Sequence, residues 1–368
     1  MIKIKFDPQI FGWQKYGGIS RLFVENALFL SNIAHVSIDA PLYQNEYLYE
    51  NINNLEIKGK FSRNLKKYNP WLVQLYNQYN FNSKNCEILH ETYYSFYGKK
   101  LSINTCRFIT VFDMIHEIFP NYTSKFNPTI HAKNYSVRRA DKVITISYST
   151  KKDLLKYLNI DEQKVHVIYP SSNLKNVTIK KQIKNKFLKN IKSWRKFPIR
   201  ALYVGHRFNH KNFKKFVLGL SNIKFLKDFS LLIFGGSNLT KKEKTFLSEK
   251  KINYQAISGS DQELKLAYQN ATFFSFPSTY EGFGIPIVEA MSLGCPVICG
   301  SNSSMGEVAQ NACLTIDMTS EYQIKEAVEL LVLNTKYREK LISLGLDRSK
   351  DFTPEKISKD LLALYLKK

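Results

Sequence analysis

The sequence has 368 residues, enough for two domains with sizeable cores, and 44% of them are hydrophobic, which is typical of a globular protein in water. Its formal net charge is +23, from 54 Lys and Arg against 31 Asp and Glu, and this imbalance favours nucleic acid, anionic lipid or an anionic substrate as partner. No apolar run approaches the roughly 18 residues of a membrane span, and the start is a strand pattern rather than a signal peptide, so we expect a cytoplasmic location.

Residues 1–175 alternate between predicted strands and helices, a pattern typical of a mostly parallel sheet with helices on both faces. A glycine pair, Gly17 and Gly18, lies between the first strand and an apolar helical pattern. It lets backbone approach a ligand closely, and a plain tight turn is the alternative. The candidate strands are Ile2–Phe6, Val36–Ala40, Glu87–His90, Arg107–Phe112, Lys142–Ile146 and Val165–Tyr169.

Asp113 and His116 follow the end of the predicted strand Arg107–Phe112. Ligand sites of α/β sheets form at this edge. An imidazole there is suited to hydrogen-bond sugar hydroxyls or to position an acceptor or a leaving phosphate. The alternative is a histidine that is satisfied by backbone at a strand end.

Two segments combine basic and apolar side chains. Residues 51–85 mix lysines with aromatic rings, which suits equally a helix at an anionic membrane surface and a helix with its rings in the core and its charges in solvent. Residues 176–199 contain no acid and carry an apolar stripe at helical spacing. We place the domain boundary in this basic linker, which is either a second membrane-facing element or a solvated connector.

Residues 200–350 repeat the alternation and predict a second Rossmann-like domain. The strand that ends at Gly205 is followed by Arg207 and Lys211, which are placed to reach a pyrophosphate. The next strand ends in a glycine turn at Gly235. Two surface charges after a strand are the alternative for the Arg–Lys pair.

The most informative stretch runs from residue 273 to residue 299. A short apolar strand is followed by a glycine turn and by a helix that starts near Pro286. Amide groups around Phe283, Gly284 and Ile285, with the positive end of the helix dipole, predict a phosphate site. Glu281 and Glu289 bracket the turn, and carboxylates beside a phosphate suit the hydroxyls of a nucleotide sugar. An ordinary strand–turn–helix unit with two acids is the alternative.

The motif from Glu281 to Glu289, Glu-Gly-Phe-Gly-Ile-Pro-Ile-Val-Glu, resembles the E-x7-E signature of glycosyltransferase family 4. The loop Gly17-Gly-Ile-Ser-Arg21 resembles that of a bacterial subgroup of mannosyltransferase-like enzymes for O-antigen and capsule. The resemblance implies an α/β GT-B fold, with two Rossmann-like domains facing a central cleft. It implies an acceptor-binding domain at 1–175, a nucleotide-sugar-binding domain at 200–350 and a terminal helix at 351–368 that crosses back to the first domain.

The resemblance also implies roles for the candidate residues. Glu281 contacts donor sugar hydroxyls and Glu289 the ribose, while Arg207 and Lys211 hold the diphosphate together with amides near Gly284. Gly17 and Gly18 lie against the donor phosphates and the acceptor, and Gly205 and Gly235 line the donor site. Asp113 and His116 serve catalysis, although many family members have a histidine where this chain has Phe112.

The implied reaction moves a sugar from a nucleotide-diphosphate sugar to a glycan or lipid-linked glycan, with retention of configuration. A GDP-mannose-type donor is favoured, with UDP or dTDP sugars as alternatives, on the inner face of the cytoplasmic membrane. No cofactor or metal is expected, because no Asp-x-Asp appears and five cysteines have no ligand spacing. Other classes are a sugar phosphorylase or epimerase of the same fold and a non-catalytic basic protein that binds membrane or nucleic acid; the absence of a recognition motif argues against nucleic acid.

Overall fold

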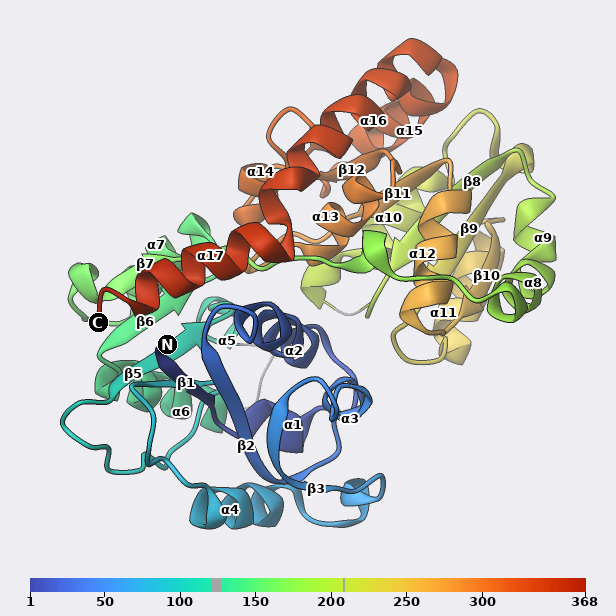
Figure 1. Cartoon of the computed structure of the whole chain (residues 1–368). Helices are drawn as coiled ribbons and strands as arrows, with labels where there is room; N and C mark the ends of the chain where they lie inside the picture. The colour runs from blue at the N-terminus through green and yellow to red at the C-terminus, as the bar shows by residue number, and fades with distance from the viewer. Residues whose placement is uncertain (121–126, 208) are drawn as a thin grey trace. The chain divides into compact units, whose positions relative to one another are not determined.

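The computed structural model describes residues 1–120, 127–207 and 209–368, which form two compact units (Figure 1). The first unit comprises Met1–Ser171 together with Thr353–Lys368, and the second comprises Ser172–Phe352. The second unit is therefore inserted into the sequence of the first. The predicted boundaries at 175 and 200 differ from these limits because the basic segment between them belongs to the second unit. The predicted boundary at 350 lies close to the observed limit after Phe352.

The first unit is built on a seven-stranded parallel sheet in the order β3-β2-β1-β4-β5-β6-β7. Every strand that the sequence predicted lies in it, with ends shifted by up to three residues. Strand β3 was not predicted. The strands are β1 Lys3–Phe6, β2 His35–Tyr43, β3 Glu56–Phe61, β4 Ile88–Glu91, β5 Cys106–Val111, β6 Lys142–Thr145 and β7 Val165–Val167.

Helices cover this sheet, and the last of them, α17, packs on α2 (Figure 1). Its Tyr365 is fully buried and hydrogen-bonds through its hydroxyl to Nδ1 of His90 on β4 at 2.5 Å. The terminal helix thus belongs to the core of the first unit. The helices are α1 Gln9–Trp13, α2 Gly18–Leu30, α3 Glu46–Glu50, α4 Pro70–Asn80, α5 Ile115–Ile118, α6 Pro128–Arg139, α7 Tyr148–Tyr157 and α17 Pro354–Tyr365.

The second unit has a six-stranded parallel sheet in the order β10-β9-β8-β11-β12-β13. The strands are β8 Ile199–Val204, β9 Phe229–Phe234, β10 Asn253–Ile257, β11 Phe273–Phe276, β12 Val297–Gly300 and β13 Leu314–Ile316. The helices are α8 Lys181–Asn190, α9 Lys192–Arg195, α10 Phe213–Leu220, α11 Lys241–Glu249, α12 Asp261–Asn270, α13 Ile285–Ser292, α14 Ser304–Ala309, α15 Glu321–Leu333 and α16 Thr335–Arg348.

The segment 51–85 is not one basic and aromatic helix, so that prediction was wrong. Lys58 and Lys60 lie on the edge strand β3, which pairs with β2, whereas Trp71, Tyr76 and Tyr79 lie on helix α4. Strand β3 is partly or fully exposed along its length and lacks the apolar alternation by which a strand is recognised. Helix α4 therefore carries rings but no charge, and on β3 only the ring of Phe61 accompanies Lys58 and Lys60.

The basic segment 176–199 is not a free linker, because it folds onto the second unit. Helix α8 packs on α12, and Phe187, Ile191 and Trp194 are all at most 1% exposed. The indole Nε1 of Trp194 donates to the carbonyl of Ser230 on β9 at 3.2 Å. The apolar stripe in this segment is thus a core contact, and it draws the basic helix into the unit that follows it.

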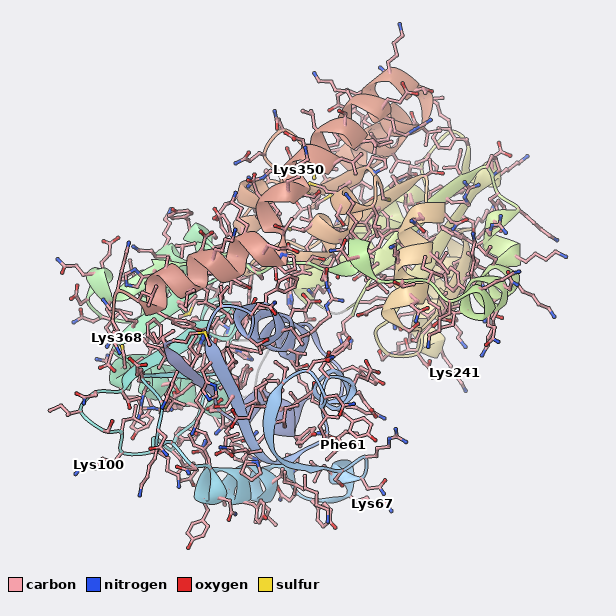
Figure 2. The ribbon with its side chains drawn as sticks, viewed as in Figure 1. Phe61, Lys67, Lys100, Lys241, Lys350 and Lys368 are labelled. Atoms are coloured by element: carbon pink, nitrogen blue, oxygen red, sulfur yellow. The ribbon has the colours of Figure 1, made fainter. Side chains whose placement is uncertain are left out.

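The positive charge is carried by exposed lysines of both units. Lys67, Lys100 and Lys368 are exposed on the first unit, and Lys241 and Lys350 on the second (Figure 2). Within the described parts of the chain, no helix is both long and apolar enough to cross a membrane.

Candidate functional site

In the second unit, the strand order reverses beside the central strand β8. Strands β9 and β10 lie on one side of it, and β11, β12 and β13 on the other. Parallel sheets bind ligands outside the carboxyl ends of the two strands at such a switch point. Arg207 and Lys211 follow β8, and Glu281 and Gly284 follow β11, so the topology brings these predicted residues to one edge.

Lys211 and Glu281 form an ion pair across this edge. The Nζ atom of Lys211 lies 2.5 Å from Oε1 of Glu281, and the two side chains are 24% and 12% exposed. Backbone contacts fix the two loops, because the amide of Thr279 donates to the carbonyl of His210 at 2.7 Å. The hydroxyl of Ser304 donates to the carbonyl of Glu281 at 2.8 Å. A cation and a carboxylate are thus held together at a point that solvent still reaches.

Arg207 is held more deeply than Lys211, with a side chain only 3% exposed. Its Nε donates to Oε1 of Glu243 at 2.8 Å, and its Nη2 donates to the carbonyl of Ser237 at 2.6 Å. Burial opposes ionisation of Glu243, but hydrogen bonds from Arg207 and Thr240 outweigh it and lower the pKa of this carboxyl. The guanidinium is therefore oriented by an anionic partner on α11.

Sequence reasoning did not identify Glu243. The pattern Thr240-x-x-Glu243 marks a capping box, and the structure confirms this box at the start of α11. The pattern signals a helix start, but it does not reveal that the same carboxylate reaches Arg207 across 36 residues.

Two glycine turns leave the backbone open beside the charged side chains. Gly205 has φ +110° and Gly235 has φ +75°, conformations that side chains rarely adopt. A Cβ at either position would meet no atom within 4 Å, whereas one at Gly236 would come within 2.6 Å of the carbonyl oxygen of Gly205. The ends of β8 and β9 therefore present bare backbone to open space.

Helix α13 begins at the predicted turn. Gly284, with φ +109°, precedes Ile285, and no side-chain hydrogen bond from the described residues caps the helix. Phe283 is buried against Phe352, with ring centroids 5.5 Å apart. Glu289 is 3% exposed and accepts a hydrogen bond from the hydroxyl of Tyr268 at 3.2 Å. The two acids of the motif thus lie in different environments, Glu281 reachable and Glu289 buried.

The predicted residues of the first unit form a separate group. The carbonyl of Gly17 accepts the amide of Arg21 at 3.0 Å and so starts helix α2. A Cβ at Gly17 would lie 2.1 Å from Oε1 of Gln14, whereas one at Gly18 would meet open space. A side chain at Gly17 would therefore displace the amide of Gln14, which accepts the backbone amide of Ser20, and Gly18 leaves room beside the helix start.

Asp113 and His116 lie on one turn after β5. Oδ1 of Asp113 accepts the amide of Ile115 at 3.0 Å, and Lys133 donates to the carbonyl of Asp113 and to Glu117, both at 2.8 Å. Burial, opposed in part by Asp113, lowers the pKa of His116, so its imidazole is neutral near pH 7. Its buried Nδ1 has no hydrogen-bond partner among the residues that the structure describes.

Phe112 occupies the position where the resembled family often has a histidine. Its ring is buried and packs edge-on against Phe23, with centroids 6.2 Å apart. It is therefore a core residue. Over the described residues, no three His, Cys, Asp or Glu side chains gather closely enough to hold a metal ion.

Comparison with known proteins agrees with this geometry. The family described as "Glycosyl transferases group 1" matches residues 184–347, which cover the switch point, Arg207, Lys211 and both glutamates. Residues 184–347 therefore resemble a glycosyltransferase group 1 domain, in agreement with the resemblance of the motif. The two parallel-sheet, Rossmann-like units of the chain are those of the GT-B fold, and this prediction is confirmed.

Two curated relatives are similar over part of their length. The chain is 31% identical over 233 residues to the O-antigen chain mannosyltransferase RfbU of Salmonella typhimurium, a match that covers 58% of this chain and 59% of that protein. It is 24% identical over 273 residues to the N-acetylgalactosamine-N,N'-diacetylbacillosaminyl-diphospho-undecaprenol 4-alpha-N-acetylgalactosaminyltransferase of Campylobacter jejuni, covering 73% of this chain and 70% of that one.

A solved structure extends the likeness to the whole chain. The protein Alr3699/HepE of Anabaena, determined in complex with UDP and glucose, superposes with a TM-score of 0.75 at 12% identity. The superposition covers 100% of both chains. At this identity the likeness establishes the fold.

Proposed function

We propose that this protein is a retaining glycosyltransferase that moves a sugar from a nucleotide-diphosphate sugar to a lipid-linked or lipopolysaccharide or capsule glycan. The observation that carries the proposal is the pairing of Lys211 with Glu281 at the switch point of the second sheet. A diphosphate needs cations, and sugar hydroxyls need a carboxylate that accepts their hydrogen bonds. Both groups follow strands at the same edge of the sheet as the open glycine turns at Gly205 and Gly235.

In this proposal the residues act mainly by positioning and by electrostatics. Arg207 and Lys211 stabilise the negative charge that develops on the leaving diphosphate. Glu281 accepts hydrogen bonds from the sugar, whereas the ribose contact that the motif implies for Glu289 requires this buried carboxylate to become accessible when the donor binds. The acceptor oxygen forms a bond to the anomeric carbon of the donor sugar as the bond between that carbon and the phosphate oxygen breaks. The proton of the acceptor hydroxyl passes to the leaving phosphate. The products are a glycoside and a nucleoside diphosphate.

Burial of Glu289 argues against a glycosidase-type mechanism, which needs two carboxylates flanking the scissile bond. Glu289 is 3% exposed and bonded to Tyr268, so Glu281 is the one accessible acid of the motif. On the first unit, His116 is neutral near pH 7, and a neutral imidazole is able to accept a hydrogen bond from an acceptor hydroxyl.

A GDP-mannose-type donor is favoured, because the curated relative RfbU is named a mannosyltransferase of the O-antigen chain. A UDP sugar is the second candidate, since the Anabaena structure of the same fold contains UDP and glucose. A dTDP sugar completes the set. The relative named for an undecaprenol-linked acceptor supports a lipid-linked glycan.

Binding of GDP, UDP, dTDP and their sugars to the full chain, by thermal shift and calorimetry, tests the donor site. We expect one nucleotide family to bind and Lys211→Ala to weaken it. A folded protein that binds none of them, but binds random duplex DNA or lipid vesicles tightly, would instead be a non-catalytic basic protein.

Peripheral association with the inner membrane face is part of the proposal. Helix α4 exposes Leu72, Tyr76 and Tyr79, and the exposed Arg63 and Lys67 precede it. Rings and an aliphatic side chain beside cations suit an anionic interface. Flotation with phosphatidylglycerol vesicles should weaken in Leu72→Ser combined with Tyr79→Ser, and equal flotation of this variant would remove α4 from the membrane contact.

A further inference from the structure

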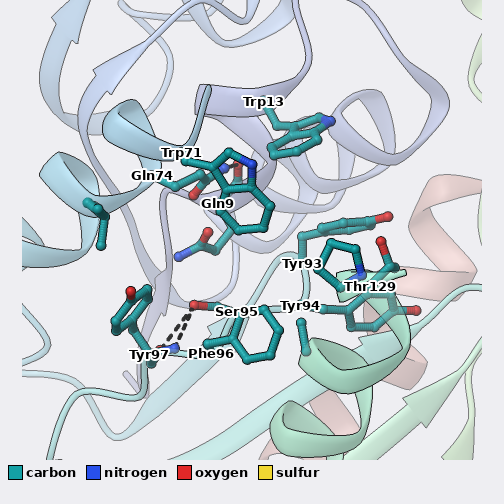
Figure 3. Close-up of a pocket in the computed structure, with 13 residues that line it drawn as sticks. Gln9, Trp13, Trp71, Gln74, Tyr93, Tyr94, Ser95, Phe96, Tyr97 and Thr129 are labelled. Atoms are coloured by element: carbon teal, nitrogen blue, oxygen red, sulfur yellow. Dashed lines mark hydrogen bonds between the residues drawn. The ribbon is translucent and has the colours of Figure 1, made fainter. Parts of the chain in front are cut away.

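The first unit contains a hollow at the switch point of its own sheet. Strand β1 lies between β2 and β4, so a ligand site is expected outside the carboxyl ends of β1 and β4. The segments that follow these strands line the hollow together with α4 and the start of α6 (Figure 3). Six aromatic residues form much of its wall: Trp13, Trp71, Tyr93, Tyr94, Phe96 and Tyr97. We call it the aromatic hollow.

Two amide side chains in the aromatic hollow lack partners. Gln9 is 3% exposed, yet its buried Nε2 has no hydrogen-bond partner among the described residues. The buried Oε1 of Gln74 is likewise unpartnered over the described chain, while its Nε2 donates to the carbonyl of Gln9 at 3.1 Å. Figure 3 shows the amide of Gln9 between Trp71 and the segment that carries Ser95 and Tyr97. A buried amide without a partner costs about 1–3 kcal/mol, so this donor and this acceptor each require a hydrogen bond with water or with a ligand in the hollow.

The wall opposite α4 is held in place before any ligand arrives. The hydroxyl of Ser95 donates to the carbonyl of Tyr97 at 3.2 Å and accepts its amide at 3.0 Å (Figure 3). Arg139 donates to the carbonyl of Ser95 at 2.6 Å, and the amide of Ser95 donates to the hydroxyl of Ser136 at 3.0 Å. A wall fixed in this way costs little ordering entropy when a ligand binds.

The lining chemistry selects the class of ligand. None of the described residues that line the aromatic hollow is charged, although the chain carries a net charge of +23. A phosphate or nucleotide is therefore a poor fit. A purely apolar chain would leave the amides of Gln9 and Gln74 unpaired. A neutral ring with apolar faces and hydroxyl edges satisfies both the aromatic wall and the two amides.

The size of the hollow is sufficient for one ring. The aromatic hollow has a volume of about 110 Å³, compared with the roughly 10–15 Å³ that one water needs on the same measure. It thus has room for several waters or for one sugar ring. Trp13, Trp71 and Tyr97 are each about half exposed, so the ring has a way in.

We propose that the aromatic hollow binds one neutral sugar ring of the acceptor glycan, with Gln9 donating to a ring hydroxyl, Gln74 accepting from another and Trp71 stacking on the apolar face. The identification of this ring with the acceptor rests on the proposed glycosyl transfer. The hollow then selects the acceptor by the pattern of its hydroxyl groups, independently of the donor site on the second unit.

The test uses saturation-transfer NMR on the full chain with three probes: methyl α-D-mannopyranoside, methyl α-D-galactopyranoside and methyl N-acetyl-α-D-glucosaminide. Tryptophan emission gives a second readout, because two of the three tryptophans, Trp13 and Trp71, line the hollow. We expect at least one glycoside to bind. Trp71→Ala and Gln9→Leu should each raise its dissociation constant about ten-fold, whereas Tyr157→Ala, on helix α7 of the same unit and 40% exposed, should change it less than two-fold.

Binding of no glycoside, or equal effects of Trp71→Ala and Tyr157→Ala, would overturn the inference. So would binding of farnesol in place of the glycosides, because an apolar chain would then be the ligand. Trp71 is half exposed, so Trp71→Ala keeps the test decisive if Gln9→Leu does not fold. Nucleotide binding without glycoside binding refutes this inference alone, whereas glycoside binding without nucleotide binding refutes the proposed transfer and leaves the sugar site standing.

Discussion

The two units place a central strand in the same topological position but surround its carboxyl end with different side chains. In the second unit the loops after β8 and β11 carry Arg207, Lys211 and Glu281. Lys211 pairs with Glu281, and Arg207 pairs with Glu243 on α11. In the first unit the loops after β1 and β4 carry aromatic rings and amides, and Asp7 has no ion pair within the described residues. The fold therefore determines where a ligand binds, and the side chains determine whether that ligand is charged or neutral.

The largest expected effect tests the charged side of this comparison. Lys211→Ala should lower kcat/KM for sugar transfer about 100- to 1000-fold, because it removes a cation from the developing charge on the diphosphate. Steady-state assays with the nucleotide sugar found by binding measure this loss. Lys215→Ala is the matched control, since Lys215 also pairs with a glutamate, Glu321, but at an exposed position. Equal rates in the two variants would contradict the role of Lys211.

A smaller effect is expected when Arg207 is replaced by lysine, which keeps the positive charge but lacks the several N–H donors of the guanidinium. Arg207→Lys should lower kcat/KM about ten-fold, because one ammonium does not reproduce the bonds to Glu243 and to the carbonyl of Ser237 together. The same assay, with the dissociation constant of the nucleotide measured beside it, separates binding from turnover. If Arg207→Lys behaves as the parent protein, the geometry of the guanidinium has no part in the reaction.

For the first unit, the expected effect is a pH dependence of stability that comes from Asp7, a carboxyl without an ion pair among the described residues. Burial, with the charge of Glu91, raises the pKa of Asp7 to about 7, although Thr92 donates to its Oδ1 from N and Oγ1 at 2.7 and 2.6 Å. The folded state thus holds a proton that the unfolded state loses above about pH 4. This carboxyl should lower the free energy of unfolding by about 1.4 kcal/mol per pH unit as pH rises from about 4 to 7.

Denaturant unfolding of Asp7→Asn measures this contribution. The variant keeps an oxygen that accepts from Thr92 but binds no proton, so its stability should fall less than that of the parent between pH 5 and 7. Asp317→Asn is the control, because Asp317 is a surface carboxyl whose pKa is lowered by hydrogen bonds from Thr319. Identical pH profiles for the parent and Asp7→Asn would show that Asp7 is ionised in the folded protein.

The smallest expected effect is none. If Arg207 and Lys211 balance the diphosphate, EDTA should leave the rate of sugar transfer within two-fold. Loss of turnover with EDTA, restored by added Mn²⁺, would show that a divalent cation takes part and that the two side chains do not suffice.

Much of the fold could be predicted because apolar runs mark buried parallel strands. β3 could not, since Glu56–Phe61 lies at the edge and buries little. The basic segment was misinterpreted because its charges outnumber Phe187, Ile191 and Trp194, which are the residues that pack.

The charged site was predictable where charges, glycines and acids follow strands within a few residues. Glu243, the partner of Arg207, could not be predicted, because the contact between these two residues depends on tertiary structure. The aromatic hollow was missed for the same reason. Gln9, Trp71, Tyr93 and Thr129 come from four distant segments, and none of them has a local pattern that distinguishes it from core or surface.

The order of folding during synthesis follows from the position of α17. Tyr365 bonds to His90, 275 residues earlier in the chain, and its ring packs edge-on against Phe108 on β5. Residues 172–352 therefore leave the ribosome before the first unit can acquire its last helix. A nascent chain that stops near residue 352 would expose apolar surface around β4 and β5, so the first unit, although its synthesis starts first, is the last to be completed.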